Sequence, residues 1–178
     1  EKLPVLKTGF KMMVDQMRDR DRVAIVTYAG EASVLLESTY GDEKTKIKNA
    51  IDKLGAGGST AGAKGILTAY EIAEKNLIPG GNNRIIIGSD GDFNVGPSST
   101  DELVKLVEEK RDGGIYLTTL GVGTGNLNDN MMEQIANKGN GNYEYIDSAD
   151  ELMKVFVNEK SKFYTVAKDS KIQITFNP

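Results

Sequence analysis

Short apolar runs rich in β-branched residues alternate along this chain with segments whose apolar residues recur at helical spacing. The first two runs follow each other closely enough to pair as a hairpin, whereas the later runs are separated by helical segments. Strands that alternate with helices imply right-handed βαβ units and a mainly parallel sheet with helices on both faces. The expected strands are residues 22–30, 32–39, 84–88, 115–123 and 142–146, and the expected helices are 2–18, 42–54, 66–77, 99–112, 128–139 and one from 148 into the 160s.

The composition is that of one soluble globular domain. The chain has 178 residues, which is enough to bury a core of its own. Hydrophobic residues make up 39% and charged residues 27% of the chain, and both values are ordinary. A net charge of -4 argues against a nucleic-acid-binding face, which is normally basic. No apolar run approaches the length of a transmembrane segment.

Neither cysteine nor histidine occurs in the chain. This excludes disulfides, thiolate nucleophiles, zinc sites built from Cys and His, and Ser-His-Asp triads. A bound metal would have only oxygen ligands, which favours Mg²⁺, Mn²⁺ or Ca²⁺.

Two carboxylates follow the expected strand in RIIIGSDGDFNVGP, residues 84–97. Asp90 and Asp92 come directly after that strand, and ligands of open α/β sheets bind beyond the carboxyl ends of the strands. Glycines at positions 88 and 91 would leave room for a ligand or metal to approach the backbone. The alternative interpretation is a polar turn that only leads from the strand to the next helix.

Two glycine-rich segments resemble nucleotide-binding loops but lack required residues. In GAGGSTAGAKG, residues 55–65, Lys64 comes one position late for a P-loop, and no Ser or Thr follows it. In GVGTGN, residues 121–126, the last glycine of a dinucleotide fingerprint is replaced by Asn126. Neither segment therefore predicts a nucleotide site, and a plain strand-to-helix turn explains residues 121–126 better.

A hydroxyl and a carboxylate remain as candidate ligands. Ser59 or Thr60 can cap the helix that follows the glycine loop, and this does not exclude metal binding by the other. The loop and Asp90 belong to different crossovers, which can meet at the same carboxyl edge of the sheet. Such a pair suits an octahedral Mg²⁺ that keeps several waters.

The sequence resembles a von Willebrand factor type A (VWA) domain along nearly its whole length. Within it, DGDFNVG and NKGNGNYEYID are similar to a bacterial subgroup found in surface or periplasmic lipoproteins. The resemblance implies a three-layer, Rossmann-like α/β fold with a mainly parallel sheet and one antiparallel edge strand. The segments that carry it are DRVAIVTYAG, LGAGGSTAG, RIIIGSDGDFNVG and TTLGVGTGNLNDNMMEQIANKGNGNYEYID.

The resemblance also implies a metal-ion-dependent adhesion site (MIDAS) that binds Mg²⁺ or Mn²⁺ and recruits an acidic group of a protein or glycan ligand. Thr60, in Gly-Gly-Ser-Thr, matches the family's threonine ligand, and Asp90 matches its aspartate. Ser59, Asp92 and Asn94 would surround the metal or shape the rim.

One part of the family pattern is missing. Asp-x-Ser-x-Ser, which follows the family's first, central strand, does not occur here. Two oxygen side chains alone hold Mg²⁺ poorly, which leaves open whether this chain binds a metal. Loss of this strand should leave a gap in the sheet between residues 22–30 and 84–88. Either these two strands move together and pair, or another chain inserts between them, as in a homodimer. We expect a piece of a longer polypeptide, with a VWA domain at 1–168 and the start of a C-terminal extension at 169–178.

The resemblance favours a non-enzymatic interaction module located outside the cytoplasm, in the periplasm or at the cell surface, and anchored through parts not in this chain. Two alternatives stay open. One is a Mg²⁺-dependent phosphoryl-transfer enzyme that uses Asp90 and Asp92, with Lys64 as the phosphate clamp. The other is a purely structural domain of a larger surface protein, in which the metal site plays no part.

Overall fold

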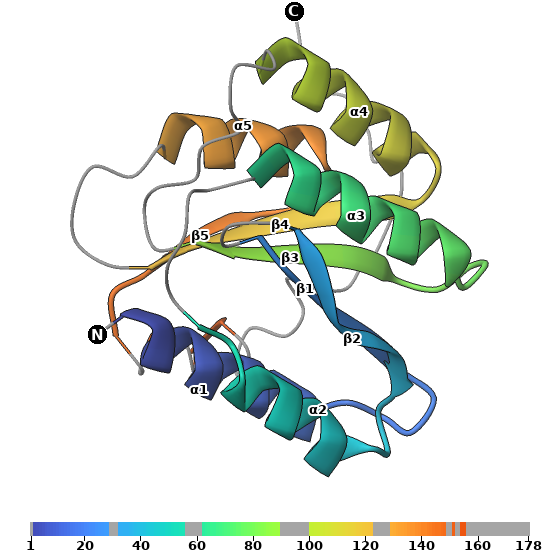
Figure 1. Ribbon diagram of the computed structural model, residues 1–178. Coiled ribbons are helices and arrows are strands. Elements are labelled where there is room, and N and C mark those ends of the chain that lie inside the picture. Colours follow the sequence, from blue (N-terminus) through green and yellow to red (C-terminus); the bar gives the residue numbers. More distant parts are fainter. Residues whose placement is uncertain are drawn as a thin grey trace, which may run out of the picture.

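The computed structural model describes residues 2–28, 32–55, 62–89, 100–122, 129–148, 151 and 154–155. Within these residues helices and strands follow one another as the sequence predicts (Figure 1). The helices are α1 (Lys2–Asp15), α2 (Lys44–Asp52), α3 (Gly62–Lys75), α4 (Thr100–Asp112) and α5 (Asp129–Lys138), and the strands are β1 (Arg22–Thr27), β2 (Ser33–Tyr40), β3 (Asn83–Ser89), β4 (Ile115–Val122) and β5 (Tyr143–Ile146).

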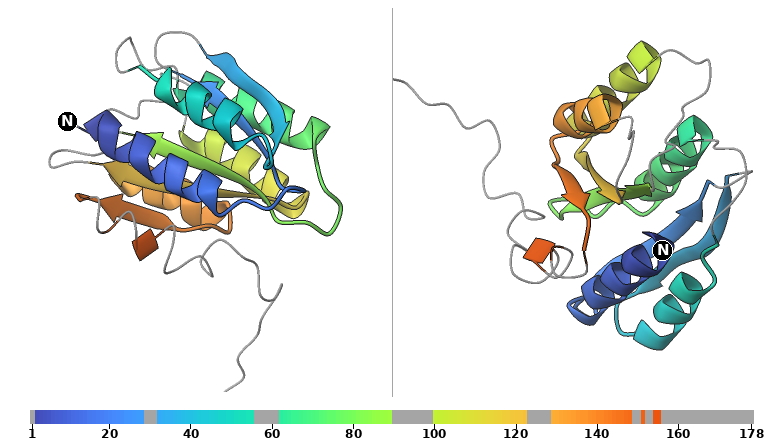
Figure 2. Two further views of the ribbon diagram at one scale, coloured as in Figure 1. Left: turned by 90° about the horizontal axis from the view of Figure 1, so that it is seen from below. Right: turned by 90° about the vertical axis from the view of Figure 1, so that its left-hand side faces the viewer.

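The described strands form two separate sheets (Figure 2). β3, β4 and β5 make a parallel sheet in that order, and β1 pairs with β2 alone as the expected antiparallel hairpin. β1 and β3 share no ladder, so the predicted gap between these two strands is confirmed. Backbone hydrogen bonds between strands therefore do not join the two sheets in this part of the chain, and side chains must do so.

Helices cover both sides of the parallel sheet. α3, α4 and α5 lie over one face, and α1 and α2 lie on the other side of the molecule (Figure 1). The three consecutive isoleucines of β3 divide between these layers, because successive side chains of a strand point to opposite faces. Ile85 and Ile87 belong to the core under α3 and α4, whereas Ile86 packs on the side of α1.

α1 connects the two sheets through its apolar face. Leu6 packs with Leu120 and Val122 of β4, and Val14 packs with Leu36 of β2 and with α2. Phe10 lies between these positions and contacts both clusters. α1 is thus the element that fastens the antiparallel pair to the parallel sheet.

α2 runs antiparallel along α1 and is tied to it by charged side chains. The Lys48 ammonium lies 2.6 Å from the Asp15 carboxylate, and Lys11 pairs with Asp52 at the other end of the contact. These ion pairs are solvent-exposed and contribute little to stability. The contact of α2 with the rest of the domain therefore depends on its buried apolar face.

Several helix boundaries differ from the expectation. α3 spans Gly62–Lys75 rather than 66–77. α1 ends at Asp15 rather than near residue 18, because Arg18 and Asp21 close a turn of their own. The Asp21 carboxylate accepts hydrogen bonds from the Arg18 side chain and backbone, and this arginine lowers the pKa of Asp21. At α2 the N-cap is Glu43, without a side-chain cap bond, so this helix begins at Lys44 rather than at the expected residue 42.

In the part of the chain that the structure describes, no helix is both long enough and apolar enough to span a bilayer.

Candidate functional site

The side chains predicted to form the site fall outside the described residues. These are Ser59, Thr60, Asp90, Asp92 and Asn94. The structure describes the elements on either side of them: Asp90 directly follows β3, and Thr60 precedes the first residue of α3 by two positions.

The described strands place the end of β3 at the carboxyl edge of the parallel sheet. Ser89, the last residue of β3, pairs with Gly121 of β4, and Val122 pairs with Ile146 at the end of β5. The three strands therefore end side by side. Asp90 continues the chain directly from this edge, where open α/β sheets bind their ligands.

Tyr28 joins the start of α3 to the end of β3. It follows β1, and its hydroxyl donates a hydrogen bond of 2.6 Å to the carbonyl oxygen of Gly88. A Cβ atom at position 65, in the first turn of α3, would lie only 2.6 Å from the Cβ of Tyr28. The absence of a side chain at Gly65 lets the helix approach the tyrosine. Thr60 lies two positions before α3 and Asp90 directly follows β3 in the sequence. The Tyr28 side chain contacts both of these elements.

Gly88 is explained by packing and not by ligand approach. A Cβ atom at position 88 would lie 3.1 Å from Leu6 and 3.3 Å from Phe10, both on α1. The expectation that this glycine leaves room for a ligand or metal is therefore wrong, because α1 occupies the space. The corresponding expectation for Gly91 lies outside the described residues.

Lys64 and Gly121 belong to the glycine-rich segments that fail as nucleotide loops. Lys64 lies in the first turn of α3 and is exposed. At Gly121 a Cβ atom would lie 2.9 Å from the Tyr143 hydroxyl oxygen, so contact with β5 accounts for this glycine. After it β4 ends and α5 begins at Asp129, which agrees with the predicted strand-to-helix connection.

Two buried polar groups lie away from the carboxyl edge. Arg84, the second residue of β3, donates a hydrogen bond of 2.7 Å to the Thr118 hydroxyl and stacks over Tyr116, and burial lowers the pKa of its guanidinium. The hydroxyl of Tyr70, inside the core under α3, has no partner among the described residues, and burial raises its pKa. Their positions assign them to the core and not to the candidate site.

Within the described ranges, no group of three or more carboxylates is arranged to hold a metal ion. The candidate ligands Thr60 and Asp90 lie outside these ranges.

Sequence reasoning missed Tyr28 and Gly65. Their contact joins residues far apart in the chain, so spacing alone could not reveal it. The sequence pattern also placed Gly65 in the glycine-rich segment before the expected helix, whereas it lies inside α3.

The VWA resemblance is confirmed by comparison with known proteins. The sequence profile of the von Willebrand factor type A domain matches residues 2–159. Over its whole length the chain is 46% identical to the uncharacterized protein YfbK of Escherichia coli (strain K12). It spans only 31% of that relative.

Solved structures agree with this assignment. The von Willebrand factor type A structure from Catenulispora acidiphila has a TM-score of 0.75 at 19% identity, covering 90% of this chain and 38% of that chain, and shows the fold. Proximal thread matrix protein 1 of the mussel byssus, with a zinc-occupied MIDAS motif, has a TM-score of 0.62 at 26% identity, covering 87% of this chain and 39% of that chain. Together with the profile match over most of its length, these likenesses show that the chain belongs to the von Willebrand factor type A domain family.

Proposed function

We propose that this domain is a non-enzymatic interaction module that binds a protein or glycan ligand through a metal ion at the carboxyl edge of the parallel sheet. One observation carries the proposal. Tyr28 contacts the first turn of α3 and donates a hydrogen bond to Gly88 near the end of β3. The two segments with the candidate ligands, Thr60 and Asp90, begin at these elements, so a shared site requires only short loop paths.

The chemistry of the candidate ligands fits Mg²⁺ or Mn²⁺. The Thr60 hydroxyl and the Asp90 carboxylate would hold the ion, and Ser59, Asp92 and Asn94 would surround it. Both ligands offer oxygen, which these hard cations prefer, and the chain contains no Cys or His that would favour zinc. When bound, the ion supplies a Lewis acid that attracts a carboxylate of the ligand.

The proposed ligand is a protein or glycan that offers an acidic group. The family's use as an interaction module and the MIDAS motif of the mussel protein support this choice. We further propose an extracytoplasmic location, by analogy with the lipoprotein subgroup, and a VWA domain that spans residues 1–168. The gap between β1 and β3 supports a homodimer as one way to satisfy the unpaired strand edges.

A binding assay with acidic probes tests the function. The probes are a fluorescein-labelled, aspartate-rich peptide and a labelled uronic-acid oligosaccharide, each titrated with the domain in Mn²⁺ and again in EDTA. We expect saturable binding of at least one probe in Mn²⁺, and a loss of at least about tenfold in EDTA or in Asp90→Asn, because the ion makes the decisive contact. Asp101→Asn, on the exposed first turn of α4, is the matched control and should bind normally. Binding that ignores EDTA would instead support a domain whose metal site plays no part.

A further inference from the structure

β2 is an edge strand in the part of the chain that the structure describes. It pairs with β1 along one side only, and no other described strand is hydrogen-bonded to it. Val34 and Tyr40 near its ends are exposed, at 39% and 54%. An unpaired strand edge presents N–H and C=O groups that can accept a further strand.

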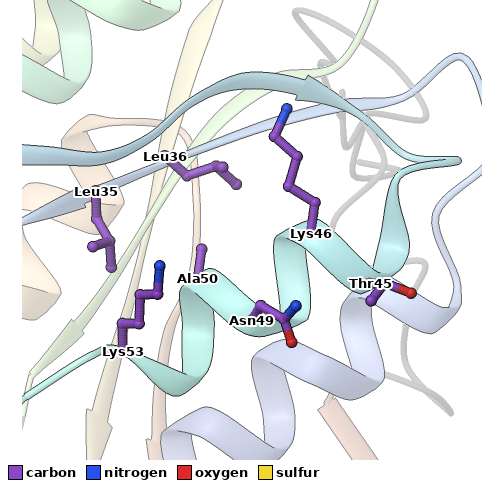
Figure 3. A pocket seen from close by; sticks show the side chains of 7 residues that line it. All are labelled: Leu35, Leu36, Thr45, Lys46, Asn49, Ala50 and Lys53. Atoms are coloured by element: carbon purple, nitrogen blue, oxygen red, sulfur yellow. The ribbon is translucent and has the colours of Figure 1, made fainter.

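A shallow groove of about 570 Å³ runs between β2 and α2 (Figure 3). Leu35 and Leu36 of β2 line one side, and Ala50 of α2 lies opposite them. Thr45 and Asn49 add polar groups from α2. The groove therefore offers apolar surface directly beside the strand edge.

The charge of the groove comes from two lysines. Lys46 and Lys53 of the α2 segment extend toward β2, one near each end of the groove, and no carboxylate is among the lining residues (Figure 3). Lys46 also pairs with Glu43 at 3.1 Å, an exposed ion pair of the kind that contributes little and exchanges readily. The seven-residue separation of the two lysines corresponds to roughly 10 Å along a helix. Side chains on one face of an extended peptide lie about 7 Å apart, so three successive ones span about 14 Å, and the outer two are within reach of the long lysine side chains.

The other two lysines of α2 contact α1 and not the groove. Lys44 donates a hydrogen bond to the Asp15 carbonyl oxygen, and Lys48 pairs with the Asp15 carboxylate. They fasten α2 to α1. Packing between the helices thus accounts for Lys44 and Lys48, and it does not account for Lys46 and Lys53.

We propose that the groove between β2 and α2 binds an extended acidic segment of a protein partner, which adds as a further strand to the edge of β2 that no described strand occupies. Apolar side chains of that segment cover Leu35 and Leu36, and its carboxylates meet Lys46 and Lys53. This surface is built from elements other than the carboxyl edge of the parallel sheet. It needs no metal, and it goes beyond the proposed function.

Fluorescence anisotropy in EDTA separates this surface from a metal site. The probe is a labelled ten-residue Val–Glu peptide in which Glu and Val alternate on one face of the strand and Thr fills the positions between them, so that both Glu and Val can face the groove. A Val–Lys peptide of the same pattern is its charge-reversed control. We expect saturable binding of the Val–Glu peptide only, weakened at least about tenfold in Lys46→Glu/Lys53→Glu, because two attractive contacts become repulsive. The matched control is Lys75→Glu/Lys105→Glu, which reverses two exposed lysines on α3 and α4 and should change affinity less than about twofold.

Three results would overturn the proposal. The first is equal binding of both peptides or of neither, and the second is full affinity in Lys46→Glu/Lys53→Glu. The third concerns a second copy of the chain as the occupant. If the unaltered chain sediments as a dimer and Lys46→Glu/Lys53→Glu sediments as a monomer, the edge of β2 serves self-association.

Discussion

Gly141→Ala is expected to lower the free energy of unfolding by about 3 kcal/mol. A Cβ atom at position 141 would lie 1.8 Å from the carbonyl oxygen of Leu117, far inside van der Waals contact. The neighbouring backbone is fixed on both sides, since Gly141 donates to the Ala136 carbonyl and Leu117 donates to the Gly139 carbonyl. Relief of the overlap therefore requires β4 and the turn before β5 to move apart.

Gly55→Ala is the matched control, because among the described residues no atom outside its chain neighbours lies within 4 Å of a Cβ at position 55. We expect its effect on the free energy of unfolding to stay within about 0.5 kcal/mol. Urea unfolding followed by circular dichroism measures both variants. Equal stability of the two variants would show that the turn before β5 does not press against β4 as described.

Phe10→Ala should destabilise the domain by about 3 kcal/mol, because truncation of a packed phenylalanine removes apolar burial and leaves a cavity. Phe10 contacts the apolar cluster of α1 with β4 and β5 and also the cluster of α1 with α2 and β2. Its ring also lies beside Gly88, where an added Cβ atom would be 3.3 Å from the ring. No strand ladder joins the two described sheets, so side-chain packing must hold them together. Phe10 contributes to this packing more than a position on a surface helix would suggest.

Leu67→Ala provides the comparison for Phe10→Ala. Leu67 is a large apolar residue on α3 that remains 46% exposed. Its truncation is expected to destabilise the domain by only about 1 kcal/mol, because about half of its surface stays in water after folding. Thermal and urea unfolding of the two variants give the difference. A loss for Phe10→Ala no larger than that for Leu67→Ala would contradict the role of α1 as the link between the sheets.

Periodicity and turn residues were sufficient to predict the local structure. The hairpin of β1 and β2 and the parallel arrangement of β3, β4 and β5 follow from short apolar runs and the segments between them. Asn140 adopts a φ of 53°, a left-handed conformation that asparagine tolerates better than most residues. The gap between β1 and β3 was also predictable, because the family pattern showed which strand was missing.

Contacts between distant residues could not be predicted. The bond from Tyr28 to Gly88 spans 60 positions, and no local pattern signals it. Gly88 shows the same limit: the glycine was noticed, but its cause lies in α1 and not in a ligand. At the candidate site the pattern offered a hydroxyl and a carboxylate and the resemblance assigned their roles, and Thr60 and Asp90 stay predictions.

The most direct measurement is a calorimetric titration of Mn²⁺ into the chain and into Thr60→Ala, Asp90→Asn and Asp101→Asn. We expect saturable binding in the unaltered chain and in Asp101→Asn. Affinity should fall at least about tenfold in Thr60→Ala and in Asp90→Asn, because each removes an oxygen ligand. No saturable binding in the unaltered chain, or an affinity unchanged in Asp90→Asn, would contradict a metal-dependent site at the carboxyl edge.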